Sequence, residues 1–203
     1  MKIYLIAATT ALLVISSAGK LSAQHSDTKA NHVTIGVKGG LNVYNVHNDN
    51  GVKYDSKIGF HLGLLGHIHL KKQFALQPEL SYSTQGAKYS VAGIENKLHL
   101  GYINVPVMLQ YMFDNGFRLQ AGPQVGFLAT AKSEANNVKV DVKDDLNKVD
   151  FAVGFGAGYV SPKSGFGIDA RYNLGLTDIS KNSSVKSTNR GFQLGVFYLF
   201  SKH

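Results

Sequence analysis

The stretch "GFHLGLLGHIHLKKQFALQPELSYSTQG", residues 59–86, decides the fold class of this chain. Large apolar side chains occupy even positions from Phe60 to Leu70, and they occupy even positions again from Phe74 to Tyr82. Successive side chains of a β-strand point to opposite faces, so this period of two predicts two strands joined by the short turn "KKQ". Each strand has one apolar face and one polar face.

The same alternation extends over the rest of the chain, and we find no convincing run of helical period. It predicts an all-β protein with eight strands, at about residues 33–44, 57–70, 74–86, 98–113, 117–131, 149–160, 166–174 and 191–200.

The connections between these strands alternate in length. Short turns lie at residues 71–73, 114–116 and 161–165, whereas long polar connections lie at about 45–56, 87–97, 132–148 and 175–190. An even number of strands with short turns at one end and long loops at the other is typical of a transmembrane barrel of bacterial outer membranes. We therefore expect an eight-stranded antiparallel up-and-down transmembrane β-barrel with both termini on the short-turn, periplasmic side.

The N-terminus has the layout of a secretory signal peptide. Lys2 precedes an apolar run over residues 3–15, and small residues follow up to Ala23. We expect cleavage of residues 1–23, a short polar leader at 24–32 and the barrel domain at 33–203, which together predict an outer-membrane location. An uncleaved membrane anchor is the alternative.

The interior of an eight-stranded barrel is only just wide enough to be filled by side chains. The many large apolar residues are therefore expected to face lipid, and the opposite positions are expected to form a polar network that plugs the lumen. In that network Glu79 could pair with Arg118 or Arg171, and Asp169 with either of them. Its expected members are Lys38, His61, His67, His69, Glu79, Arg118, Asp169 and Arg171.

Two further features follow from the strand patterns. In residues 98–113 the apolar positions change from even to odd, which predicts a β-bulge near Tyr102 to Asn104. Tyrosines near strand ends are candidates for aromatic girdles at the membrane interfaces, namely Tyr82, Tyr102, Tyr111, Tyr159, Tyr172 and Tyr198.

Candidate sites for chemistry are weak. His61, His67 and His69 share one strand face, but zinc takes three or four protein ligands and the sequence fixes no others nearby, so we expect lumen or rim histidines rather than a metal site. Ser81 or Ser83 beside His61 or His67 is the one arrangement with a nucleophile and a base. The chain has no cysteine, which excludes disulfides and thiolate sites. We expect no cofactor.

The chain carries a formal net charge of +8 at pH 7. Lysines in the long connections, such as Lys132, Lys139 and Lys181, are interspersed with acids, such as Glu134 and Asp144. This pattern fits either a solvated mixed-charge surface or contact with anionic lipopolysaccharide or an extracellular ligand. Nucleic acid is not an expected partner for an exported chain of this kind.

Five segments together resemble the PorT-like outer-membrane β-barrel family: "VTIGVKGGLNV", "FALQPELSYSTQGAK", "YINVPVMLQYMF", "FRLQAGPQVGFL" and "ARYNLGLTDI". The resemblance implies an eight-stranded outer-membrane barrel. Members of that family largely lack a defined biochemical activity, and one namesake assists a protein secretion system, a role that carries over to no residue here. Outer-membrane barrels commonly end on an aromatic residue that the assembly machinery recognises, so this machinery is a further expected partner. Here "SKH" follows the aromatic residue Phe200, which departs from that pattern.

Three functions remain open from the sequence. The first is a non-enzymatic outer-membrane barrel that presents long extracellular loops for envelope structure or for binding. The second is a secreted, lipocalin-like carrier, which would remain soluble without detergent. The third is a lipid-modifying enzyme of the outer membrane, which would lose its activity when the serines or histidines above are replaced.

Overall fold

A computed structural model describes residues 33–48, 54–91, 94–181 and 186–200. The predicted signal peptide, its leader and the terminal "SKH" lie outside the described residues. Among the residues described, no helix is long and apolar enough to span a membrane. The strands are β1 (Val33–Asn48), β2 (Asp55–Lys71), β3 (Phe74–Val91), β4 (Ile94–Met112), β5 (Phe117–Ala135), β6 (Val138–Asp141), β7 (Val149–Val160), β8 (Phe166–Gly175) and β9 (Ser187–Phe200).

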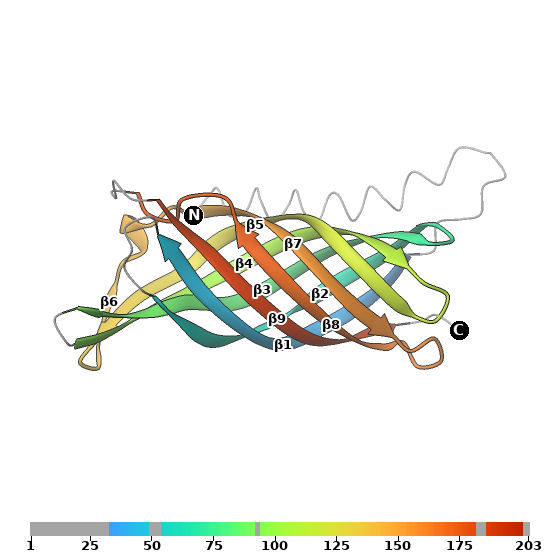
Figure 1. Cartoon of the computed structure of the whole chain (residues 1–203), viewed down its shortest axis with the longest axis horizontal. Helices are drawn as coiled ribbons and strands as arrows, with labels where there is room; N and C mark the ends of the chain where they lie inside the picture. The colour runs from blue at the N-terminus through green and yellow to red at the C-terminus, as the bar shows by residue number, and fades with distance from the viewer. Residues whose placement is uncertain (1–32, 49–53, 92–93, 182–185, 201–203) are drawn as a thin grey trace. The chain divides into compact units, whose positions relative to one another are not determined.

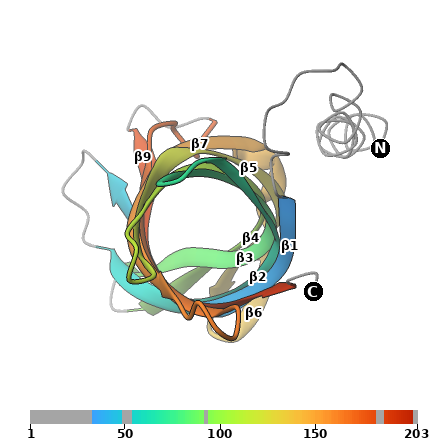
Figure 2. The same cartoon turned by 90° about the vertical axis from the view of Figure 1, so that its right-hand side faces the viewer.

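Eight of these strands close into a ring (Figures 1 and 2). Each pairs antiparallel with its neighbours in the chain, apart from β6, and the pairing of β1 with β9 closes the barrel. The short β6 pairs only with the outer end of β5 and forms a hairpin beyond the ring. The predicted eight-stranded antiparallel barrel is therefore confirmed.

The apolar positions of the strands face outward. On β2, Ile58 is 73 % exposed and Leu62 is 65 % exposed, and on β9 Val196 is 62 % exposed. Buried polar side chains such as Asn42, Gln77 and Gln110 occupy the alternate positions inside. A lipocalin-type carrier would need the opposite arrangement, with its apolar side chains around an internal cavity.

Aromatic side chains gather at the short-turn end of the outer surface. Phe74, Tyr111, Phe113 and Phe117 form one chain of ring contacts, with centroids 5.0 to 5.6 Å apart. Across the barrel, Tyr198 contacts the rings of Phe166 and Phe200 in the same way, at 4.6 and 5.3 Å. These rings occupy the position of an interfacial aromatic girdle.

The predicted β-bulge in β4 is wrong in its position. The inward positions of β4 stay even throughout, from Leu98 to Gln110, so Tyr102 is 1 % exposed inside the barrel and is not a girdle residue. The extra residue is Ala129 on β5, because Gly101 pairs with Thr130 whereas Tyr102 pairs with Leu128. The apolar residues at even positions of β4 pack against one another in the lumen. In the sequence they resemble lipid-facing residues, which led to the prediction that the strand changes its lipid-facing side.

Two of the four predicted long loops contain extended strand. β3 and β4 stay paired up to Val91 and Ile94, and β5 continues to Ala135 before it pairs with β6. Most of their side chains are polar because these strand ends extend past the apolar belt. Polarity alone made them resemble loops.

Candidate functional site: a filled lumen and a cap at the long-loop end

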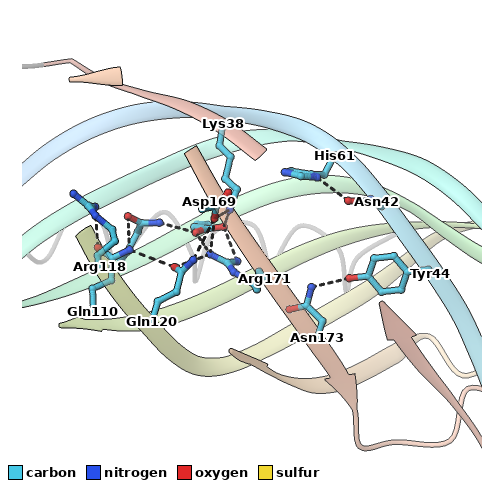
Figure 3. Close-up of polar contacts among 12 residues, drawn as sticks. Lys38, Asn42, Tyr44, His61, Gln110, Arg118, Gln120, Asp169, Arg171 and Asn173 are labelled. Carbon is cyan, nitrogen blue, oxygen red and sulfur yellow. Dashed lines mark hydrogen bonds and ion pairs between the residues drawn. The ribbon is translucent and has the colours of Figure 1, made fainter. Parts of the chain in front are cut away.

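An ion cluster crosses the centre of the lumen (Figure 3). Arg171 on β8 donates to both carboxylate oxygens of Glu79 on β3, from Nη1 to Oε2 at 3.1 Å and from Nη2 to Oε1 at 2.6 Å. Lys38 on β1 donates to Asp169 Oδ2 and lies 3.8 Å from Glu79 Oε2. All four side chains are at most 4 % exposed. Bidentate arginine–carboxylate pairs are among the strongest charge-assisted contacts, so the cluster ties three strands across the barrel.

Glutamine side chains extend this cluster toward the short-turn end. Gln120 donates to Asp169 Oδ2 at 3.2 Å and accepts from Arg171 Nη2 at 3.1 Å. Gln110 accepts from Arg118 Nη1 at 3.1 Å. Arg118 forms no direct ion pair with a described residue, and its guanidinium lies 5.7 Å from the centre of the Phe197 ring. Of the pairs considered from sequence, Glu79 with Arg171 is present, and Asp169 contacts Arg171 only at 3.8 Å.

His61, His67 and His69, the three histidines predicted to lie in the lumen or at its rim, occupy different environments. His61 is buried, and its Nδ1 lies 2.7 Å from Asn42 Oδ1. His67 is buried further along β2, where its ring meets the ring of His69 edge-on at 4.6 Å. His69 is exposed at the short-turn end, outside the central cluster. In the described part of the chain, no group of three or more His, Asp or Glu side chains is placed to hold a metal ion.

Ser83 pairs across the ladder with His61, but its hydroxyl is engaged elsewhere. Ser83 Oγ accepts hydrogen bonds from Asn42 Nδ2 at 2.9 Å and from Gln85 Nε2 at 3.3 Å, and the residue is fully buried. This serine is held in a structural network, with no exposed face for a substrate.

Glycines of β7 make room for polar side chains of the lumen and for the backbone of β8. A Cβ on Gly154 would lie 2.9 Å from Asn173 Oδ1 and 3.3 Å from Arg171 Cδ, and one on Gly156 would lie 3.1 Å from Gln120 Nε2. On β9, a Cβ on Gly195 would lie 2.6 Å from Asp169 Oδ1. The glycine-lined side of β7 therefore fits the close packing expected of a small filled barrel.

Apolar layers cover the ion cluster at both ends. Toward the short turns, Leu65, Val160, Phe197 and Leu199 form a buried cluster inside the barrel. Toward the long connections, a second buried cluster fills the lumen, formed by Val46, Ala87, Leu100, Tyr102, Leu128, Ala131 and Ile179. Neither layer was predicted from the sequence, although apolar residues at inward positions, such as Leu65 and Phe197, were a detectable signal.

Two connecting segments fold over the second layer, and we call residues 142–147 and 177–181 the cap. Val142 and Leu146 pack against the apolar cluster to which Ile179 belongs. Asn147 donates from its backbone to Ile179 O at 2.9 Å and from Nδ2 to Asp178 O at 2.9 Å and Ser180 O at 3.2 Å. Lys181 reaches back to Asp144 O at 2.7 Å. The two segments of the cap are thus joined by hydrogen bonds and lie against the apolar layer at the long-loop end.

Beside the cap, a charged chain links β2, β4, β5 and β6. Lys57 Nζ lies 2.8 Å from His99 Nδ1, and His99 Nε2 lies 3.0 Å from Glu134 Oε2, which Lys139 approaches to 3.5 Å. Burial and the nearby charge of Lys57 lower the pKa of His99, and burial also lowers the pKa of Lys57. Desolvation opposes the ionisation of Glu134, but the charges of Lys139 and His99 outweigh it and lower its pKa.

Solved structures of two outer-membrane surface proteins share this fold. Ail, the attachment invasion locus protein of Yersinia pestis, superposes with a TM-score of 0.53 at 18% sequence identity, over 82% of this chain and 98% of Ail. Neisserial surface protein A (NspA) superposes with a TM-score of 0.56 at 12% identity, over 82% of this chain and 98% of NspA. No curated protein sequence matches the chain significantly.

The family comparison is more direct. Residues 22–181 match the family described as outer membrane protein beta-barrel domain, and this match covers most of the chain. The closed ring and its outward apolar side chains are the structure that such a domain requires. The chain therefore belongs to the outer membrane protein beta-barrel domain family.

Proposed function

We propose that this protein is a non-enzymatic, non-conducting outer-membrane barrel whose role is to hold the ordered cap and the β5–β6 hairpin at the cell surface for binding or for envelope structure. The observation that carries this proposal is the filled lumen, in which an ion cluster lies between two apolar layers. A lumen filled in this way leaves the extracellular face as the part available to partners. Loops on a rigid scaffold commonly carry recognition.

An enzymatic role has less support. The serine–histidine pair that the β2–β3 ladder brings together, Ser83 and His61, is buried in the lumen, and the serine hydroxyl already accepts two hydrogen bonds. A lipid substrate would have to displace the surrounding network to reach it.

The proposal includes three finer expectations. Residues 1–23 are removed as a signal peptide, the assembly machinery inserts the barrel, and lipopolysaccharide is its lipid partner in the outer leaflet. The motifs "QPELSYSTQGAK", "INVPV" and "GPQVG" support placing the chain in the PorT-like branch of outer-membrane barrels.

Single cysteines test this arrangement directly, because the chain has none of its own. Val138→Cys lies on β6, and Asp114→Cys lies in the turn between β4 and β5. A membrane-impermeant maleimide added to intact cells should label the β6 cysteine and spare the turn cysteine, which should react only after the outer membrane is permeabilised. Cell fractionation and a heat-dependent shift on a gel show whether both variants form folded membrane barrels. Equal labelling of both sites, or a mature protein that stays soluble without detergent, would overturn the proposal.

A further inference from the structure

The outer wall of the barrel carries an apolar groove on its β1–β9–β8–β7 side. The groove has a volume of about 550 Å³, and its lining is almost wholly apolar. Small residues, among them Gly39 and Ala170, lie between the exposed side chains of Leu41, Ile168, Leu194 and Val196. Because these positions belong to the lipid-facing set, the groove opens to the hydrocarbon of the bilayer.

A second hollow lies nearer the long-loop end of the same strands. This pocket has a volume of about 270 Å³ and mixes apolar and polar groups, with Val43 and Tyr172 beside Asn45, Ser56 and Arg190. Asn45 and Arg190 are direct cross-strand partners on β1 and β9. Val43 pairs with Phe192 at the next outward position, so the polar groups lie immediately beyond the apolar belt.

The two hollows follow one line along the barrel wall. Leu41 of the groove and Val43 of the pocket are consecutive outward residues of β1, and Ala170 and Tyr172 are consecutive outward residues of β8. Leu194 and Arg190 lie on β9, four residues apart, which corresponds to about 13 Å along a strand. An apolar groove thus leads to a cationic pocket at the membrane interface.

The charges in the pocket favour an anionic ligand. Within the described part of the chain, Arg190 forms no ion pair, its Nε has no hydrogen-bond partner, and no carboxylate lines the pocket. Guanidinium groups bind phosphate through paired hydrogen bonds. By contrast, the lysines on the opposite side of the rim lie among acids such as Glu134.

We propose that this line of hollows is a binding site for one lipopolysaccharide molecule, with an acyl chain of its lipid A in the groove and a lipid A phosphate at Arg190. The inference rests on the proposed outer-membrane location and lipid partner, and deepens them by naming the binding site on the barrel wall. The long-loop end of the barrel faces the outer leaflet in that location, which is why lipopolysaccharide is the occupant and a glycerophospholipid is not.

Native mass spectrometry of the purified, refolded full chain tests the site with three added lipids: lipid A, the same lipid A after removal of its phosphates, and phosphatidylglycerol. The wild type should retain one lipid A and should favour it over both of the other lipids. Arg190→Gln should weaken lipid A binding about five-fold, the effect of one interfacial cation. Ala170→Leu fills the groove without adding a polar group and should also weaken binding. Lys88→Gln, which removes a cation outside both hollows, serves as the control and should bind as the wild type does.

Binding to Arg190→Gln within two-fold of the wild type would overturn the site, and so would equal retention of dephosphorylated lipid A by the wild type. Equal retention of phosphatidylglycerol would overturn the assignment to lipopolysaccharide. The lipid comparisons on the wild type decide the matter even if a variant fails to fold. A heat-dependent gel shift is read for every sample, because its absence in the wild type counts against the proposed membrane barrel and not against the lipid site alone.

Discussion

At the scale of single residues, Glu79 is the central acceptor of the lumen. It receives two hydrogen bonds from Arg171 and lies near Lys38, while Asp169 is the other carboxylate of the cluster. We expect Glu79→Gln to lower the free energy of unfolding by about 3–5 kcal/mol, because it leaves buried cations without their partner. Urea unfolding in lipid vesicles measures this change.

Glu95→Gln is the matched control for that variant. Glu95 pairs with Lys97 at 3.2 Å, but its side chain is 57 % exposed, and exposed pairs contribute about 1 kcal/mol or less. Similar losses for the two variants would show that the lumen cluster is not a stabilising unit.

His99 provides a test in pH. Burial and Lys57 lower its pKa in the folded barrel, so the unfolded chain takes up a proton first as the pH falls below about 6.5, and folding loses stability in that direction. The lowered pKa of Glu134 acts with the same sign at more acidic pH. An NMR titration should place the His99 midpoint below 6.5, and Lys57→Met should move it upward. An unchanged midpoint would remove Lys57 as a cause.

At the scale of elements, the outward face of each strand can be tested one position at a time. Leu80 on β3 and Leu194 on β9 both face outward, with exposures of 42 % and 54 %. Arginine at either position should cost about 2–4 kcal/mol near the membrane midplane and reduce the fraction of protein that inserts into vesicles. Val138→Arg, on the exposed β6 hairpin, should insert normally. Normal insertion of all three variants would contradict the outward assignment.

The Asn147 side chain joins the two segments of the cap. Asn147→Ala removes both hydrogen bonds from Nδ2 to the segment that contains Asp178 and Ser180. We expect faster hydrogen exchange at residues 177–181, with the barrel strands unchanged. Exchange that rises equally in the ring would mean that the cap and the barrel unfold together.

The strands were predictable from sequence because each lipid-facing position has to be apolar. The contact partners within the lumen were not predictable in this way. The alternation of side chains along each strand is enough to place Glu79, Asp169 and Arg171 on the inner side of the barrel. The choice of Lys38 as the partner of Asp169 depends on closure of β1 against β9, which brings together residues 131 positions apart. Leu100 was misplaced for a related reason, because apolar residues that seal a lumen have the same composition as residues that face lipid.

At the scale of the whole molecule, the filled interior predicts the absence of a pore. A barrel of this strand number has room for side chains only, and here ionic and apolar layers occupy that room. The wild type reconstituted in a planar bilayer should give no discrete conductance steps, whereas a sixteen-stranded porin under the same conditions should give them. Uniform steps from the purified protein would show that the layers separate.

The alternation of outward apolar and inward polar residues also has a consequence for the unfolded chain during translocation. Translocation across the inner membrane halts at segments of about 18 or more consecutive apolar residues. Here a polar or glycine residue interrupts every strand at short intervals, as in Val33–Asn48 and Asp55–Lys71. The extended polypeptide therefore has no stop-transfer signal in these strands. A continuous apolar outer surface forms only when the ring closes.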